Sequence, residues 1–209
     1  MSLKKQTAVY FCRMHTYTDG LYHQHFLQLP PWRQEKVLRI KDKDKRKEST
    51  LSFILLQNAL KNGFGIENFT FEYNEKGKPY LADRTAFLSI SHSREAVAVA
   101  VSRHEIGLDV ECIRHPKEAV LNRMFTDAEK NCIRTSKEPD LAFTRLWTEK
   151  EAKAKLFGKG IWEKDEREIT DSVIFGGWDF PSFCISVCQE KAHGETDEIS
   201  IHEILSSML

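Results

Sequence analysis

The segment Ile106-Gly-Leu-Asp-Val-Glu111 decides how this chain is interpreted. Apolar residues alternate in it with Gly107, Asp109 and Glu111, and this alternation predicts a strand. Successive side chains of a strand point to opposite faces, so the two carboxylates share a face. Gly107 on that face allows another stretch of backbone to approach closely. The segment therefore predicts a strand that makes a close contact and then presents two acidic groups.

A second segment, Trp147-Thr-Glu-Lys-Glu-Ala-Lys-Ala-Lys155, follows Asp109 after 37 residues (110 to 146). Glu151 and Lys155 are four residues apart, so a helix places them on one face. Alone, such a pair is typical of a solvated helix, to which it contributes roughly a few tenths of a kcal/mol. If the strand and the helix meet, three carboxylates converge beside one ammonium group. That arrangement suits a hard divalent cation that holds a phosphorylated substrate.

The composition restricts the classes of partner. The 209 residues include 31 basic and 31 acidic side chains, so no global field favours nucleic acid or an anionic membrane surface. The longest apolar runs, such as Phe53-Ile-Leu-Leu56, are too short to cross a bilayer, and no apolar signal segment follows the first lysines. Five irregularly spaced cysteines favour reduced thiols over a zinc site. We expect a cytoplasmic protein without nucleic-acid or membrane partners.

Predicted strands and helices alternate along the rest of the chain. Strands are expected over about 7–12, 69–73, 87–91, 96–102 and 106–113, with two or three more between 171 and 204 around His193-Gly194. Helices are expected from Pro30-Pro31, before Gly63 and Gly65, from Pro116, from the capping box Thr126–Glu129, and over 139–157 with Leu141, Leu146 and Phe157 facing the core. The order of strands and helices repeats about twice along the chain. It predicts an α+β fold of two similar halves, 1–103 and 104–209, each a small antiparallel sheet packed against helices.

Three polar segments upstream can each be interpreted in two ways. Ser89-Ile-Ser91-His92-Ser93 is either a turn whose serines satisfy backbone groups or a phosphate cradle with His92 as donor. Gly77-Lys78-Pro79 is either a plain turn or a rigid loop that presents Lys78. The basic residues Arg33, Lys36, Arg46 and Lys47 form either a solvated face or part of an anion site.

These residues together resemble a known family. Gly-x-Asp-x-Glu, followed some forty residues later by Trp-(Ser/Thr)-x-Lys-Glu-(Ala/Ser)-x-x-Lys, is the pattern of 4′-phosphopantetheinyl transferases of the surfactin-synthetase-activator type. The family's upstream blocks are present as Gly77-Lys78-Pro79-Tyr80 and Ser89-Ile-Ser91-His92-Ser93. The likeness spans about residues 30 to 160.

The resemblance implies transfer of the phosphopantetheine arm of coenzyme A to a serine of an apo acyl or peptidyl carrier protein, releasing adenosine 3′,5′-bisphosphate. Larger members of the family are pseudo-dimers of two α+β halves, so it also implies activity as a monomer. Two other functions are weighed: a carrier-protein or nucleotide-binding module without catalysis, and a metal-dependent phosphohydrolase that uses the same carboxylates. The identity of the carrier protein stays open.

The resemblance also assigns roles to residues of this sequence. Asp109, Glu111 and Glu151 are expected to hold Mg²⁺, with Mn²⁺ left open, and Lys155 to stabilise the transferring phosphate. Glu151 is the first candidate to accept the serine proton, directly or through a metal-bound water, and the identity of this base stays open. Asp109 and His92 complete the expected catalytic set. Coenzyme A is expected to contact Lys78, Ser91, His92 and Lys155 through its phosphates, Pro79 near the adenine, and Arg33, Lys36 and Arg46 at the 3′-phosphate. Glu129 either assists this site or belongs only to its capping box.

Overall fold

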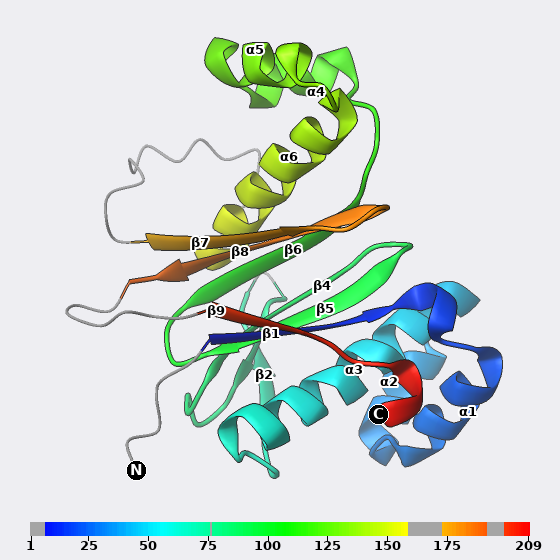
Figure 1. Cartoon of the computed structure of the whole chain (residues 1–209). Coiled ribbons are helices and arrows are strands. Elements are labelled where there is room, and N and C mark those ends of the chain that lie inside the picture. Colours follow the sequence, from blue (N-terminus) through cyan, green and yellow to red (C-terminus); the bar gives the residue numbers. More distant parts are fainter. Residues whose placement is uncertain (1–6, 76, 159–172, 192–198) are drawn as a thin grey trace.

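Two β-sheets face each other in this protein, and each carries a long helix on its outer side (Figure 1). The computed structural model describes residues 7–75, 77–158, 173–191 and 199–209. The four layers are α3, the first sheet, the second sheet and α6. The predicted α+β class is therefore confirmed.

The first sheet contains four strands in the order β4-β5-β1-β9. Its strands are β1 (Thr7–Arg13), β4 (Phe87–His92), β5 (Ala96–Ser102) and β9 (Ile199–Glu203). β4, β5 and β1 pair antiparallel, as predicted, whereas β9 pairs parallel to β1. The last strand of the chain thus returns to the sheet built by residues before 104, which the predicted division into 1–103 and 104–209 does not anticipate.

Helices cover one face of the first sheet. Leu51 and Leu55 of α3 pack against Val97 and Val99 of β5 in one apolar cluster. The other elements of this part are η1 (Met14–Thr16), α1 (Asp19–Gln28), α2 (Pro31–Leu38), α3 (Lys43–Phe64), β2 (Phe71–Tyr73), β3 (Pro79–Leu81) and the terminal turn η2 (Ser206–Met208). As predicted, a glycine ends α3, because Gly65 takes a left-handed conformation with φ 67°.

The second sheet contains three antiparallel strands in the order β6-β8-β7. They are β6 (Ile106–Cys112), β7 (Val173–Asp179) and β8 (Phe183–Glu190). α6 (Pro139–Leu156) covers its outer face, and α4 (Glu118–Met124) and α5 (Asp127–Thr135) lie at the start of α6 (Figure 1). α4 begins two residues beyond the predicted start at Pro116, and His193-Gly194 lies outside the described residues.

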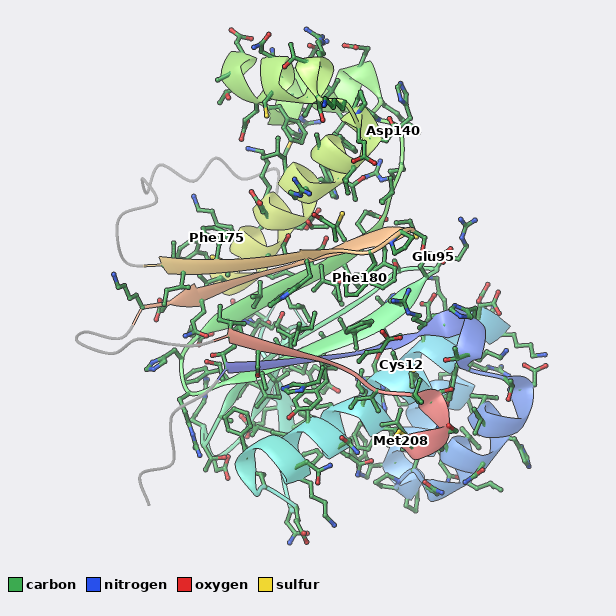
Figure 2. All side chains as sticks on the ribbon, viewed as in Figure 1. Cys12, Glu95, Asp140, Phe175, Phe180 and Met208 are labelled. Atoms are coloured by element: carbon green, nitrogen blue, oxygen red, sulfur yellow. The ribbon has the colours of Figure 1, made fainter. Side chains whose placement is uncertain are left out.

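The apolar layer between the sheets fixes the direction of the acidic residues. Leu108 and Val110 of β6 pack with Phe11 and Ala98 of the first sheet, and Figure 2 shows Phe180 in this same layer. Because side chains alternate along β6, Asp109 must point to the opposite face, toward α6. The inter-sheet core therefore determines which face of β6 carries the carboxylates.

The predicted core positions of α6 are right in part, because Leu146 and Phe157 pack against buried apolar clusters whereas Leu141 belongs to neither of these clusters. Leu141, Leu146 and Phe157 are half-buried, whereas Phe143, Trp147, Ala152 and Leu156 are buried. The helix packs at its start against α4 and α5, and near its end against Cys188 of β8. These two contacts decide which side chains of α6 are fully buried, and they differ from the positions predicted from the sequence. The five cysteines are free, as expected. In the parts of the chain that the structure describes, no helix combines the length and apolar character needed to cross a membrane.

Candidate active site

The two motif segments meet in an open hollow of about 270 Å³. β6 contributes Asp109 and Glu111, and α6 contributes Glu151 and Lys155. Its lining residues are Ile90, Ser91, His92, Asp109, Val110, Glu111, Trp147, Glu151 and Lys155. The structure therefore brings together the three carboxylates, the lysine, Ser91 and His92.

Gly107 makes this meeting possible. A methyl group at its Cα would lie 3.0 Å from the carbonyl carbon of Ala152 and closer still to Ala152 O and Leu156 N. The backbones of β6 and α6 thus approach to a distance that only glycine allows. The predicted close approach before Asp109 is confirmed, and α6 is its partner.

Asp109 lines the hollow and is 7% exposed. Its Oδ1 atom accepts hydrogen bonds from Lys155 Nζ at 2.8 Å and from Ser91 Oγ at 2.9 Å. Lys155 Nζ also donates to Ser91 Oγ at 2.9 Å. Charge-assisted bonds of this kind hold the carboxylate and the ammonium group in a fixed relation.

Two serines of β4 complete the edge of β6. Ser89 Oγ accepts a hydrogen bond from Leu108 N at 2.9 Å, and Ser91 Oγ accepts one from Val110 N at 3.2 Å. Both backbone groups belong to the side of β6 that has no strand partner in the second sheet. Of the two interpretations of Ser89–Ser93, the one in which serines satisfy backbone groups therefore describes these side chains. The backbone groups that Ser89 and Ser91 satisfy belong to β6, whereas Ser93 Oγ accepts from Glu95 N and Ala96 N of the local turn, both at 3.4 Å.

The remaining carboxylates have different surroundings. Burial raises the pKa of the Glu151 carboxyl, and the charge of Asp109 adds to this shift while Lys155 opposes it. Glu111 Oε2 lies 3.7 Å from Arg114 Nε. Within the described ranges, no three His, Cys, Asp or Glu side chains form a group that could hold a metal ion. The expected Mg²⁺ ligands thus share a hollow, and their joint binding of one ion stays a prediction.

A second hollow of about 370 Å³ shares Ile90 and His92 with the first. Basic side chains of α2 and α3 line it, together with Glu48, whose Oε2 lies 3.0 Å from His92 Nδ1. Its charged or aromatic lining residues are Arg33, Lys36, Lys45, Glu48, Phe53, Phe71, Tyr73 and His92. The two hollows therefore adjoin at His92, one mainly acidic and the other mainly basic.

Arg33 is held in place in the second hollow. Its Nη2 atom donates to Ser49 O at 2.8 Å and to Ser49 Oγ at 2.9 Å, and its guanidinium lies over the ring of Phe53. Its Nε atom is buried and has no hydrogen-bond partner among the described residues. Burial lowers the pKa of this guanidinium. A buried donor without a partner is costly, so this position favours an anionic or accepting ligand.

Lys36 lies beside Arg33, and its Nζ atom donates to Tyr73 Oη at 2.6 Å. Pro79 lines the same hollow, and its expected place near the adenine stays a prediction. Arg46 does not line it, because its guanidinium donates to the carbonyl groups of Ile40 at 2.5 Å and Leu38 at 3.4 Å. These contacts place Arg46 at the end of α2, away from the other basic residues.

Lys78 does not line either of these hollows. Its Nζ atom lies 3.2 Å from Ile106 O, 3.1 Å from Lys155 O and 3.4 Å from Glu105 Oε2. The side chain thus joins the β2–β3 loop to the start of β6 and the end of α6. In this conformation it contacts protein oxygens where the resemblance implies a coenzyme A phosphate.

Glu129 belongs to the capping box of α5, since Thr126 N and Thr126 Oγ1 both donate to it. It also pairs with Lys150 Nζ at 2.8 Å. The capping interpretation is therefore confirmed. Three further residues, Lys45, Glu48 and Tyr73, line the second hollow and were not predicted from the sequence. Lys45 and Glu48 lie in the charged run 41–48, where the alternation of positive and negative residues does not indicate which side chains face inward.

Comparison with known proteins supports the family resemblance that the two motif segments indicate. Residues 105–195 match the family model of the 4′-phosphopantetheinyl transferase superfamily. The 4′-phosphopantetheinyl transferase gsp of Aneurinibacillus migulanus is 33% identical over 118 residues, which cover 54% of this chain and 49% of the relative. HetI of Nostoc sp. is 33% identical over 135 residues, covering 59% and 57%. Sfp of Bacillus subtilis is 26% identical over 138 residues, covering 64% and 62%.

This chain spans about half to three-fifths of the length of these curated relatives. Both motif segments, Ile106–Glu111 and Trp147–Lys155, lie within the residues that match the family model. The resemblance of this chain to the 4′-phosphopantetheinyl transferase superfamily, which its two motifs indicate, is therefore confirmed.

Proposed function

We propose that this chain transfers the 4′-phosphopantetheine group of coenzyme A to a serine of an apo carrier protein. The observation that carries the proposal is the adjacency of an acidic hollow, with Asp109, Glu151 and Lys155, to a basic hollow with Arg33 and Lys36. Coenzyme A has a pyrophosphate to be cleaved, which suits a cation held by the carboxylates of the acidic hollow, and a separate 3′-phosphate, which suits the basic hollow. The names of the relatives support the same reaction.

The carboxylates of the acidic hollow suit Mg²⁺. Asp109, Glu111 and Glu151 would hold it, because hard oxygen ligands are those it prefers and burial already disfavours the charge of Glu151. When bound, Mg²⁺ supplies positive charge next to the pyrophosphate.

The reaction forms a bond between the serine oxygen and phosphorus and breaks the pyrophosphate P–O bond. Adenosine 3′,5′-bisphosphate leaves with the electron pair of the broken bond. Glu151, whose carboxylate lies in the acidic hollow, accepts the proton of the serine hydroxyl. Lys155 stabilises charge on the transferring phosphate.

The basic hollow holds the nucleotide end in this proposal. Arg33 and Lys36 bind the 3′-phosphate, with the unpartnered Nε of Arg33 as one donor. Pro79 borders the adenine. His92, which lines both hollows, donates to a phosphate between them. Arg46 does not belong to this proposed phosphate site, because its guanidinium donates to backbone carbonyl groups at the end of α2.

A transfer assay tests the function. The protein is incubated with Mg²⁺, coenzyme A and a panel of serine-bearing apo carrier proteins, and the intact mass of each carrier is measured. A gain of one phosphopantetheine on any carrier, lost when the acceptor serine is replaced by alanine, supports the transferase. Coenzyme A binding without a mass gain on any carrier would indicate a binding module. Release of nucleotide without a carrier would indicate a phosphohydrolase.

Lys155→Met is expected to lower kcat by about 10²-fold while the Kd for coenzyme A rises only slightly, because the lysine acts on charge that develops in the transition state. Steady-state transfer kinetics and calorimetric titration with coenzyme A separate the two effects. Lys153→Met is the control, since Lys153 lies on the same helix and does not line the hollow. A large rise in Kd at unchanged kcat would contradict this role of Lys155.

Lys36→Ala is expected to weaken binding of coenzyme A by about tenfold and leave binding of 3′-dephospho-coenzyme A unchanged, because one charge-assisted bond to the 3′-phosphate is lost. Calorimetry with both nucleotides measures the difference. Arg39→Ala is the control: Arg39 follows the same helix, pairs with Glu35 and does not line the hollow. Equal weakening for both nucleotides would place the 3′-phosphate elsewhere.

The cellular setting and assembly belong to the proposal as well. We propose action in the cytoplasm as a monomer on an acyl or peptidyl carrier protein. The doubled order of strands and helices supports the monomer, because one chain supplies both sheets that border the site.

A further inference from the structure

The Ser91 hydroxyl uses its whole hydrogen-bonding capacity inside the protein. It donates to Asp109 Oδ1 at 2.9 Å and accepts from Lys155 Nζ at 2.9 Å and from Val110 N at 3.2 Å. A hydroxyl group has one proton and two lone pairs, so these three bonds occupy all of them. Ser91 is also only 5% exposed. A phosphate oxygen could bind it only by displacing Asp109.

The bonds of Ser91 act on the two groups that the proposed reaction needs most. Ser91, Asp109 and Lys155 form a closed triangle with sides of 2.9, 2.8 and 2.9 Å. Both bonds to Asp109 are made by Oδ1, and no bond to its Oδ2 is found among the described residues. The triangle thus fixes one carboxylate oxygen and leaves the other for a ligand.

Ser89 provides the comparison within the same strand. Its hydroxyl accepts from Leu108 N at 2.9 Å, just as that of Ser91 accepts from Val110 N. Both serines are buried, at 4% and 5% exposed, and both complete the edge of β6. Ser89 is not a lining residue of the acidic hollow, whereas Ser91 is. The two residues therefore share a structural role, to which Ser91 adds its contacts with Asp109 and Lys155.

We propose that Ser91 is a positioning residue: its hydroxyl holds the Asp109 carboxylate and the Lys155 ammonium in register and does not bind a phosphate of coenzyme A. The strand register supplies the reason for its place, because the β4 side chain opposite Val110 is the one that reaches Asp109. The consequence for catalysis rests on the proposed transferase function, whereas the triangle itself can be tested without it.

The test compares Ser91→Ala with Ser89→Ala in the full chain. Both variants are expected to lower the thermal midpoint, because each leaves one β6 amide without its acceptor, and Ser91→Ala more so because it also loses the bonds to Asp109 and Lys155. Only Ser91→Ala is expected to lower kcat, by about 10- to 100-fold, because small displacements of reacting groups are costly. The Kd for coenzyme A, measured by calorimetry with and without Mg²⁺, should stay within about twofold in both. Ser91→Thr, which keeps the hydroxyl, should restore the rate.

A second measurement is independent of transfer. Lys155 is acylated by an amine-reactive ester, and its labelling rate is followed by peptide mass spectrometry. The rate should rise in Ser91→Ala, where the lysine loses one of its two acceptors, and stay unchanged in Ser89→Ala. If the wild-type protein transfers nothing to any carrier, the function fails while this measurement still decides the role of Ser91.

Three results would overturn the proposal: a Kd for coenzyme A raised more than about tenfold in Ser91→Ala at unchanged kcat, equal losses of kcat in the two alanine variants, or unchanged labelling of Lys155. Should Ser91→Ala not fold, Ser91→Cys takes its place, because a thiol is a weak donor and acceptor of similar shape. Its kcat is expected to fall and its Kd to remain; the reverse pattern would contradict the positioning role.

Discussion

Asp109→Asn is expected to reduce transfer to carrier protein by about 10³-fold, the upper end of what removal of one electrostatic group costs. Asparagine keeps the shape of the side chain and an oxygen that can accept the bonds from Ser91 and Lys155. It loses the negative charge that Mg²⁺ and the Lys155 ammonium need. The variant should therefore remain folded, with a thermal midpoint near that of the wild type. Intact-mass assays of the carrier and a melting curve measure the two quantities.

Glu151→Gln should have a comparable effect for a related reason. Its carboxyl is disfavoured as a charge by burial and by Asp109, so the neutral amide should not destabilise the fold. It cannot accept a proton from the carrier serine, and it is a poorer cation ligand. Glu149→Gln is the matched control, because Glu149 lies on the same helix and does not line the hollow. Full activity of Asp109→Asn or Glu151→Gln would mean that the catalytic site lies elsewhere.

Local patterns were sufficient to predict which charged side chains gather in this hollow. Alternation along β6 placed Asp109 and Glu111 on one face, and the spacing of four placed Glu151 beside Lys155. Gly107 indicated that another stretch of backbone packs closely against the strand. These features depend on period and on backbone sterics, which a sequence expresses directly, and the structure brings all four charged side chains to one hollow.

The features that could not be predicted depend on contacts between distant parts of the chain. Ser91 bonds Asp109 only because the edge of β4 lies beside that of β6. Lys78 donates to backbone carbonyl groups of β6 and α6, which no local pattern places near it. β9 joins the first sheet in parallel, a pairing that spans almost the whole chain. In a charged run, sequence alone does not distinguish the lysine that faces a ligand from one that faces protein or solvent.

Gly107→Ala tests the contact that joins the strand to the helix. A Cβ atom at this position would lie 3.0 Å from the carbonyl carbon of Ala152 and nearer to Ala152 O and Leu156 N. The clashing atoms are helix backbone, which cannot rotate away, so α6 would have to move off the sheet. Overpacking a core typically costs about 1–3 kcal/mol, and we expect at least the upper end of that range here because backbone must shift.

The displacement would also carry Glu151 and Lys155 away from Asp109, so transfer should fall even in the fraction that stays folded, by about 10²-fold for a shift near 1 Å. Urea unfolding and transfer kinetics of the same preparation measure the two effects. Gly177→Ala in β7 of the same sheet is the control: its Cβ would meet only Ile185 O, at 3.9 Å, so stability should change little or rise slightly. If Gly107→Ala were as stable and active as Gly177→Ala, the close packing of α6 on β6 would not be what holds the three carboxylates and the lysine together.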